Sequence, residues 1–183
     1  MLACSKANAW EESLELLRNF GSNETSIVAF NSLIGACGRG RRPDMAMEIL
    51  NDMEDSYGVR PDSRSYRNAI IACNQAEHEK RREERRKKKK RSKEDAPTPT
   101  FEWWECAVSL LRRMQEHGLR ADTQTFSSAI SACEAAGQWQ RALGILQSML
   151  DADEEGHEDE SSVLNQYGFN AVISACENAC ACL

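Results

Sequence analysis

The stretch FNSLIGAC, at residues 30–37, recurs along the chain and decides the fold. Its copies are YRNAIIAC at 66–73, FSSAISAC at 126–133 and FNAVISAC at 169–176. Each copy reads aromatic, two variable residues, an apolar residue, Ile, one variable residue, Ala and Cys, and Ala3-Cys4 is the remnant of a further copy. This self-similarity predicts a stack of repeats, because one such unit cannot bury its apolar side chains alone.

A second apolar pattern follows each Cys at fixed offsets. Trp139 opens it six residues after Cys133, and the apolar side chains then recur at helical spacing. They are Met47, Leu50 and Met53 in one unit, and Leu143, Leu146 and Met149 in another. Steps of three and four residues place side chains on one face of a helix. Each unit is therefore predicted to be two helices joined by a short turn.

One unit departs from this spacing, and the departure locates an insertion. The residues Trp104, Ala107, Leu111 and Met114 match the later second helix, but they lie much further from Cys73 than the rule allows. We therefore expect an insertion over about residues 76–100, between the paired helices. Its composition predicts a charged, disordered segment. A single helix is the alternative, because Glu83 and Glu84 each precede a lysine by four residues.

The charges are concentrated in two opposed blocks. The chain of 183 residues has 23 Lys and Arg, 29 Asp and Glu, and a net charge of −6. Residues 80–93 hold 11 of the basic side chains and two acidic ones, whereas residues 151–160 hold seven carboxylates and no Lys or Arg. Without both blocks the net charge is −8. The basic block is interpreted as a solvated insertion, a contact for RNA phosphate or a nuclear-localisation-like signal.

The predicted fold class is all-α: a right-handed α-solenoid of helix-turn-helix repeats, with three complete repeats and a half repeat at each end. The expected units are 1–25 (second helix of a truncated repeat), 27–62, 63–122 with the insertion at about 76–100, 123–165 with an acidic extension at about 151–162, and 166–183 (first helix of a truncated repeat).

The unit resembles the pentatricopeptide repeat. The resemblance rests on VAFNSLI at 28–34, AMEIL at 46–50, Met53 followed by GVRPD at 58–62, and MQEHGLRAD at 114–122. It implies single-stranded RNA binding with one base per repeat, in support of organellar RNA processing, stability or translation. It also implies a mitochondrial or chloroplast location. A protein-interaction scaffold, or the RNA-binding arm of a larger nuclease, remains the alternative.

The resemblance also implies which residues read bases: the one after the first-helix aromatic and the last residue of the repeat. These are Asn31 with Asp62, Arg67 with Asp122, Ser127 with Asn165, and Asn170. The combination of Asn and Asp favours uracil in the family, whereas Ser is typical of purine recognition. Arg67 departs from the family pattern. The slot that packs bases between repeats holds Val28, Arg64, Gln124 and Tyr167, of which Val28 and Tyr167 are the candidates.

The sequence gives no sign of catalysis. It has no phosphate-binding loop or dinucleotide fingerprint, and its three His residues fall in expected turns or charged segments. We therefore predict no catalytic residue, no cofactor, no metal and no small-molecule substrate. No apolar run is long enough for a membrane span. The repeated Cys is interpreted as a small packing residue rather than a metal ligand or a disulfide partner. Single-stranded RNA, or else a protein, is the expected partner.

Overall fold

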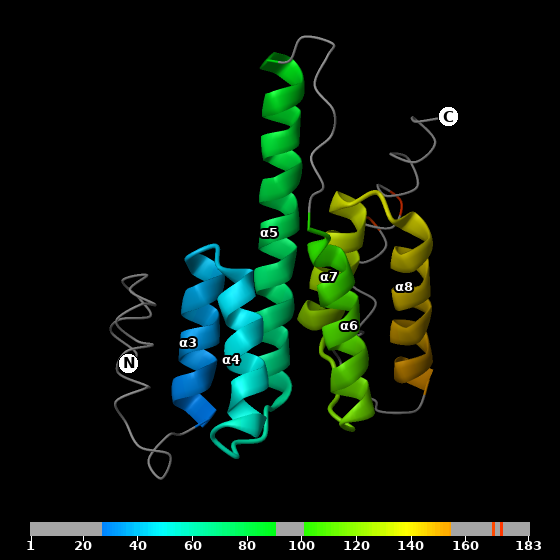
Figure 1. Ribbon diagram of the computed structural model, residues 1–183. Coiled ribbons are helices and arrows are strands. Elements are labelled where there is room, and N and C mark those ends of the chain that lie inside the picture. Colours follow the sequence, from blue (N-terminus) through cyan, green and yellow to red (C-terminus); the bar gives the residue numbers. More distant parts are fainter. Residues whose placement is uncertain (1–26, 91–100, 155–169, 171–172, 174–183) are drawn as a thin grey trace.

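The structure, a computed structural model, describes residues 27–90, 101–154, 170 and 173. Over these residues the secondary structure is helical, without strands. The helices are α3 (Ile27–Arg39), α4 (Pro43–Asp55), α5 (Ser63–Lys90), α6 (Trp103–Glu116), α7 (Thr123–Ala135) and α8 (Trp139–Glu154). They pair as three hairpins standing side by side (Figure 1). The α-solenoid of helical hairpins is confirmed, while the expected half repeats fall almost wholly outside the described residues.

The first helices of the hairpins form a continuous layer. Helix α5 packs against both α3 and α7, and each second helix packs against the first helix of the next hairpin. Within the described residues, the backbones of α4 and α6, and those of α6 and α8, do not approach closely, although Arg113 Nη1 of α6 donates a hydrogen bond to Asn51 Oδ1 of α4 at 2.8 Å. Closer packing on the side of the first helices bends the stack, so α3, α5 and α7 line its inner side. The right-handed sense of the superhelix stays a prediction.

The repeated motif supplies the centre of the core. Its aromatic residues Phe30, Tyr66 and Phe126, and its cysteines Cys37, Cys73 and Cys133, are all buried. The three cysteines are free thiols. Burial raises the pKa of Cys37 to about 11 and the pKa values of Cys73 and Cys133 to about 12. Because these thiols stay protonated at neutral pH, they act as small apolar packing groups, as predicted.

The apolar stripe of the second helices is narrower than the sequence predicts. Leu50 and Met53 are buried, as are their counterparts Leu146 and Met149. Leu143, however, is 40 % exposed, so it lies at the edge of the predicted stripe. It follows the fully buried Ala142 by one residue, which turns it about 100° away from the centre of the buried face.

Of the two expectations for the insertion, disorder or a single helix, the structure shows a helix over residues 76–90. Helix α5 runs unbroken through them to Lys90, well beyond the end of its hairpin (Figure 1). An existing helix needs no new nucleus to continue. The first residues of the insertion also pack on neighbouring helices: Glu77 is 2 % exposed. Residues 91–100 lie outside the described residues. The acidic extension begins as the last turn of α8, and its remainder is likewise outside them.

Candidate functional site

The junction between the first two hairpins is built around Asp62. This residue precedes α5 and caps its N-terminus: the Ser65 backbone N–H donates to Asp62 Oδ1 at 2.8 Å, and the Asp62 backbone N–H donates to Ser65 Oγ at 3.2 Å. The reciprocal pair satisfies two backbone donors of the first helical turn. The Asp62 carboxylate is thereby fixed at the start of α5.

Asn31 of α3 reaches this cap from the preceding hairpin. Its Nδ2 donates to Asp62 Oδ1 at 3.1 Å, and its Oδ1 accepts a hydrogen bond of 2.6 Å from Ser65 Oγ. Asn68 Nδ2 donates to the Asn31 backbone carbonyl at 2.9 Å. Both the nitrogen and the oxygen of the Asn31 side-chain amide are therefore hydrogen-bonded, and the residue is only 6 % exposed. A neutral amide beside a carboxylate forms the first junction.

The second junction repeats this plan with a different bridging side chain. Asp122 caps α7, because its Oδ1 accepts hydrogen bonds from the Thr125 backbone N–H at 2.9 Å and from Thr125 Oγ1 at 2.6 Å. Arg67 of α5 takes the place of Asn31, and its Nη1 lies 2.5 Å from Asp122 Oδ2. The Arg67 side chain is 25 % exposed and that of Asp122 is 49 % exposed. The second junction is thus a half-exposed ion pair.

Both capping carboxyl groups have lowered pKa values. Burial raises the pKa of Asp62, but hydrogen bonds from the Ser65 backbone and from the Asn31 and Ser65 side chains outweigh it. Burial likewise raises the pKa of Asp122, and the Thr125 hydrogen bonds together with Arg67 more than offset that effect. Both groups are therefore negatively charged at neutral pH and accept hydrogen bonds.

The third predicted pair is described only in part. Ser127 Oγ is buried and has no hydrogen-bond partner within the described residues. Its predicted partner Asn165 and the base-packing candidate Tyr167 lie outside them. Asn170 is helical and exposed. Of the packing slot, Val28 is 55 % exposed, and Arg64 and Gln124 at the same level of α5 and α7 are exposed too.

The structure therefore brings together two of the predicted pairs, Asn31 with Asp62 and Arg67 with Asp122. Their role in reading bases stays a prediction. Sequence reasoning missed Ser65 and Thr125, which hold the aspartates in place. The signal was available in part, because Asp just before an apolar run is a preferred N-cap residue whose carboxylate accepts the backbone N–H two or three residues later.

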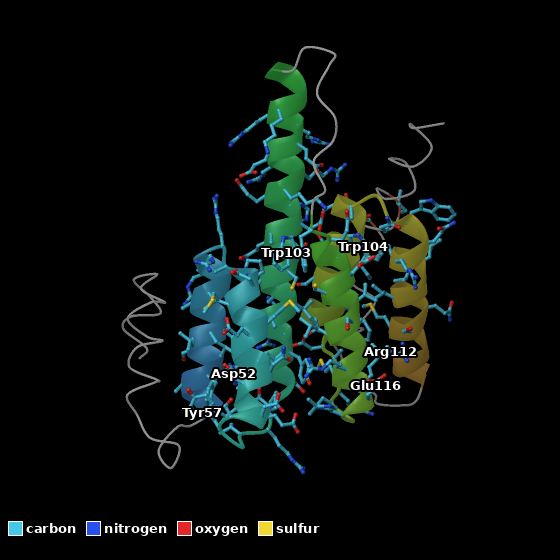
Figure 2. All side chains as sticks on the ribbon, viewed as in Figure 1. Asp52, Tyr57, Trp103, Trp104, Arg112 and Glu116 are labelled. Atoms are coloured by element: carbon cyan, nitrogen blue, oxygen red, sulfur yellow. The ribbon has the colours of Figure 1, made fainter. Side chains whose placement is uncertain are left out.

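The described side chains that could bind a metal ion do not form a cluster. Among the described side chains, no three of His, Cys, Asp and Glu come close enough to hold a metal ion. No helix in that part of the chain has the length and apolarity of a membrane span. Trp103 and Trp104 open α6, and Figure 2 places them beside α5. Trp104 is buried, and its indole N–H donates to Glu102, so it serves helix packing.

Comparison with known proteins identifies the repeat. Residues 25–75 match the model of the PPR repeat family, and residues 124–153 match that of the PPR repeat. A chloroplastic pentatricopeptide repeat-containing protein of Arabidopsis thaliana is 24 % identical over 79 % of this chain. Another pentatricopeptide repeat-containing protein of that plant is 28 % identical over 60 % of it. The matches cover 14 % and 15 % of those proteins, so the chain spans about one seventh of their length. Two segments of the chain, residues 25–75 and 124–153, are thus similar to the pentatricopeptide repeat.

Proposed function

We propose that this array of pentatricopeptide repeats binds single-stranded RNA and selects bases at the junctions between its hairpins. The observation that carries the proposal is the meeting of Asn31 with Asp62, and of Arg67 with Asp122. Each junction combines a side-chain donor with a carboxylate acceptor at the entry of a first helix. A donor beside an acceptor can form paired hydrogen bonds with the Watson–Crick edge of an unpaired base.

The first junction is proposed to select uracil. Uracil presents an N3–H donor between two carbonyl acceptors, which complements the carboxylate of Asp62 and the amide N–H groups of Asn31. Val28, exposed one turn before Asn31, offers an apolar surface against which the base can pack. The second junction holds a guanidinium instead of an amide, and we propose that Arg67 also contacts phosphate. In the third repeat, Ser127 is the proposed purine reader.

The cellular role follows from the same proposal. We infer that the protein acts on organellar transcripts, in a chloroplast or mitochondrion, during processing, stabilisation or translation. The chloroplastic relative supports this location. In this proposal the array contributes binding.

A titration with labelled single strands tests base selection. We would measure fluorescence anisotropy with two oligonucleotides that differ only in one uracil-rich or adenine-rich segment. Substitution Asn31→Ser should shift the preference from uracil towards purine. Asn51→Ser is the matched control, because Asn51 is an exposed residue of the second helix α4. An unchanged preference in Asn31→Ser would contradict the proposal.

A protein-interaction scaffold is the second candidate. It is favoured by the 6 % exposure of Asn31 and by the neutralisation of Arg67 by Asp122, since both reduce what the junctions offer to a base. The acidity of the chain outside its two charge blocks also favours it. The same titration separates the two functions, because a scaffold would bind neither oligonucleotide while retaining a protein partner in co-purification.

A further inference from the structure

Helix α5 extends far beyond the hairpin to which it belongs. The last residue of α3 is Arg39, and its equivalent in α5 is Gln75, yet α5 continues to Lys90. The extra residues add about 22 Å of helix at 1.5 Å per residue. Figure 1 shows this end of α5 rising clear of the other five helices. We refer to residues 76–81 as the root of the extension and to residues 82–90 as the arm.

The root is fixed to the second hairpin. Glu77, 2 % exposed, accepts a hydrogen bond of 3.2 Å from the Trp104 backbone N–H at the start of α6. Lys80 lies 3.1 Å from Glu77 and 3.3 Å from Glu102. These contacts tie α5 to α6 around a buried carboxylate.

The root also contacts the hairpins on either side. His78 Nε2 lies 2.8 Å from Ser131 Oγ of α7, and Arg41 in the turn after α3 pairs with Glu79 at 3.2 Å. All three hairpins therefore contact the root. These contacts fix the direction in which the arm leaves the solenoid.

The arm itself is exposed and basic. It contains seven Lys and Arg against Glu83 and Glu84, and every side chain of residues 82–87 is exposed. Arg85, Arg86 and Lys87 form no ion pair with any carboxylate of the described residues. Arg82 lies 3.8 Å from Glu79 of the root, so within the described residues most of the charge of the arm is left to solvent or to a ligand.

The basic face of the arm continues the inner face of the solenoid. Arg82 follows Arg64 by eighteen residues, and Arg85 follows Arg67 by the same interval. Eighteen residues make five full turns, so the members of each pair face the same side of α5, about 27 Å apart. Glu83 and Glu84 are turned about 100° and 200° from Arg82. Arginines of the arm thus face the side on which Arg67 meets Asp122.

We propose that the arm binds the phosphate backbone of the RNA, without regard to its bases. This inference rests on the proposed RNA-binding function and assigns a second contact to the same ligand. The positive charge of the arm favours a polyanionic ligand. The rest of the chain could not attract phosphate, because without its two charge blocks it carries a net charge of −8. The arm adds positive charge on the inner side, where counterion release on phosphate binding supplies affinity.

The test replaces three arginines of the arm in the full chain. The variant Arg82→Gln/Arg85→Gln/Arg86→Gln keeps good helix formers and removes three charges. The matched control, Arg112→Gln/Arg120→Gln/Arg141→Gln, removes three charges from exposed arginines outside α5. Figure 2 places Arg112 with Glu116 on α6. Circular dichroism confirms that both variants retain their helicity before binding is measured.

Affinity for uracil-rich and adenine-rich strands is then measured over a range of KCl concentrations. For the arm variant we expect at least a tenfold loss at low salt for both strands, an unchanged ratio between them, and a salt dependence shallower by about 2 logarithmic units per decade. The control should change affinity and slope far less.

The outcomes separate this inference from base selection. If the arm variant keeps the wild-type affinity and slope while the base preference persists, the arm does not bind phosphate and the proposed function stands. If the wild type shows no base preference and the arm variant no longer binds RNA, base selection is wrong and the arm contact stands. Absence of RNA binding by the wild-type chain overturns both proposals, and an arm-dependent protein partner would then explain the charge.

Discussion

The two described junctions share a framework and differ in one side chain. In both, an aspartate caps a first helix through the residue three positions later, Ser65 or Thr125. The bridging residue from the preceding helix is Asn31 at one junction and Arg67 at the other. Helix capping places the carboxylate, and the bridging residue then decides whether the junction is a buried amide contact or a half-exposed ion pair. Recognition can therefore vary without altering the fold.

The largest expected effect is on stability at the first junction. Replacing Asp62 with Ala removes a helix cap, which costs about 1 kcal/mol, and leaves the buried Asn31 amide without its acceptor, which adds about 1–2 kcal/mol. Asp122→Ala should cost only about 1 kcal/mol, because Arg67 can turn to water. Urea unfolding followed by circular dichroism measures both. Asp62→Asn keeps a capping oxygen and serves as the control; equal losses at the two junctions would contradict the comparison.

The second prediction makes the two junctions alike. Arg67→Asn places an amide opposite Asp122, as at the first junction, and should create a preference for uracil at the neighbouring position of the RNA. We expect about a tenfold discrimination against adenine, or about 1.4 kcal/mol. Anisotropy titrations with strands differing at that one base measure it. Arg67→Lys, which retains the positive charge, should create no such preference; if it does, charge rather than the amide pair governs selection.

The third prediction concerns the free energy of unfolding at acidic pH. Because the folded-state pKa values of Asp62 and Asp122 lie below the ordinary value, the folded chain binds these protons less readily than the unfolded chain. Their stabilising contribution is complete above about pH 4 and declines as the pH falls through the lowered pKa values. The loss should be smaller than that caused by Asp62→Ala, since a protonated carboxyl still has an acceptor oxygen. Urea unfolding at a series of pH values measures it, and Asp62→Asn/Asp122→Asn should flatten that part of the profile.

The smallest effect is expected from the ion pair alone. Arg67→Ala should lower the free energy of unfolding by no more than about 1 kcal/mol, because solvent screens a half-exposed pair. Asn31→Ala should cost more, since it removes the hydrogen bonds with Asp62 and Ser65 from a residue that is only 6 % exposed. Thermal and urea unfolding of the two variants side by side decide the order. A larger loss from Arg67→Ala would mean that the second junction is the more tightly coupled one.

Much of the architecture could be predicted from the repeated motif. Its spacing predicted the hairpins and the burial of Cys37, Cys73 and Cys133, and the family resemblance named Asn31 and Asp62 as a pair. Leu143 belongs to the predicted stripe yet is 40 % exposed, because periodicity gives the face of a helix but not the width of its contact. For the arm the sequence left both disorder and a single helix open, because its composition carries no record of the neighbours that fix its root.

The sequence by itself determined the repeat, the helix pairing and the positions of the capping aspartates. These depend on local propensity and on apolar periodicity, which are properties of short segments. Only the tertiary structure decided that Arg67 is neutralised by Asp122, that Glu77 is buried at the start of α6, and that the arm is a straight continuation of α5. Each of these depends on groups far apart in the chain, whose charges and hydrogen bonds meet only when the hairpins stack.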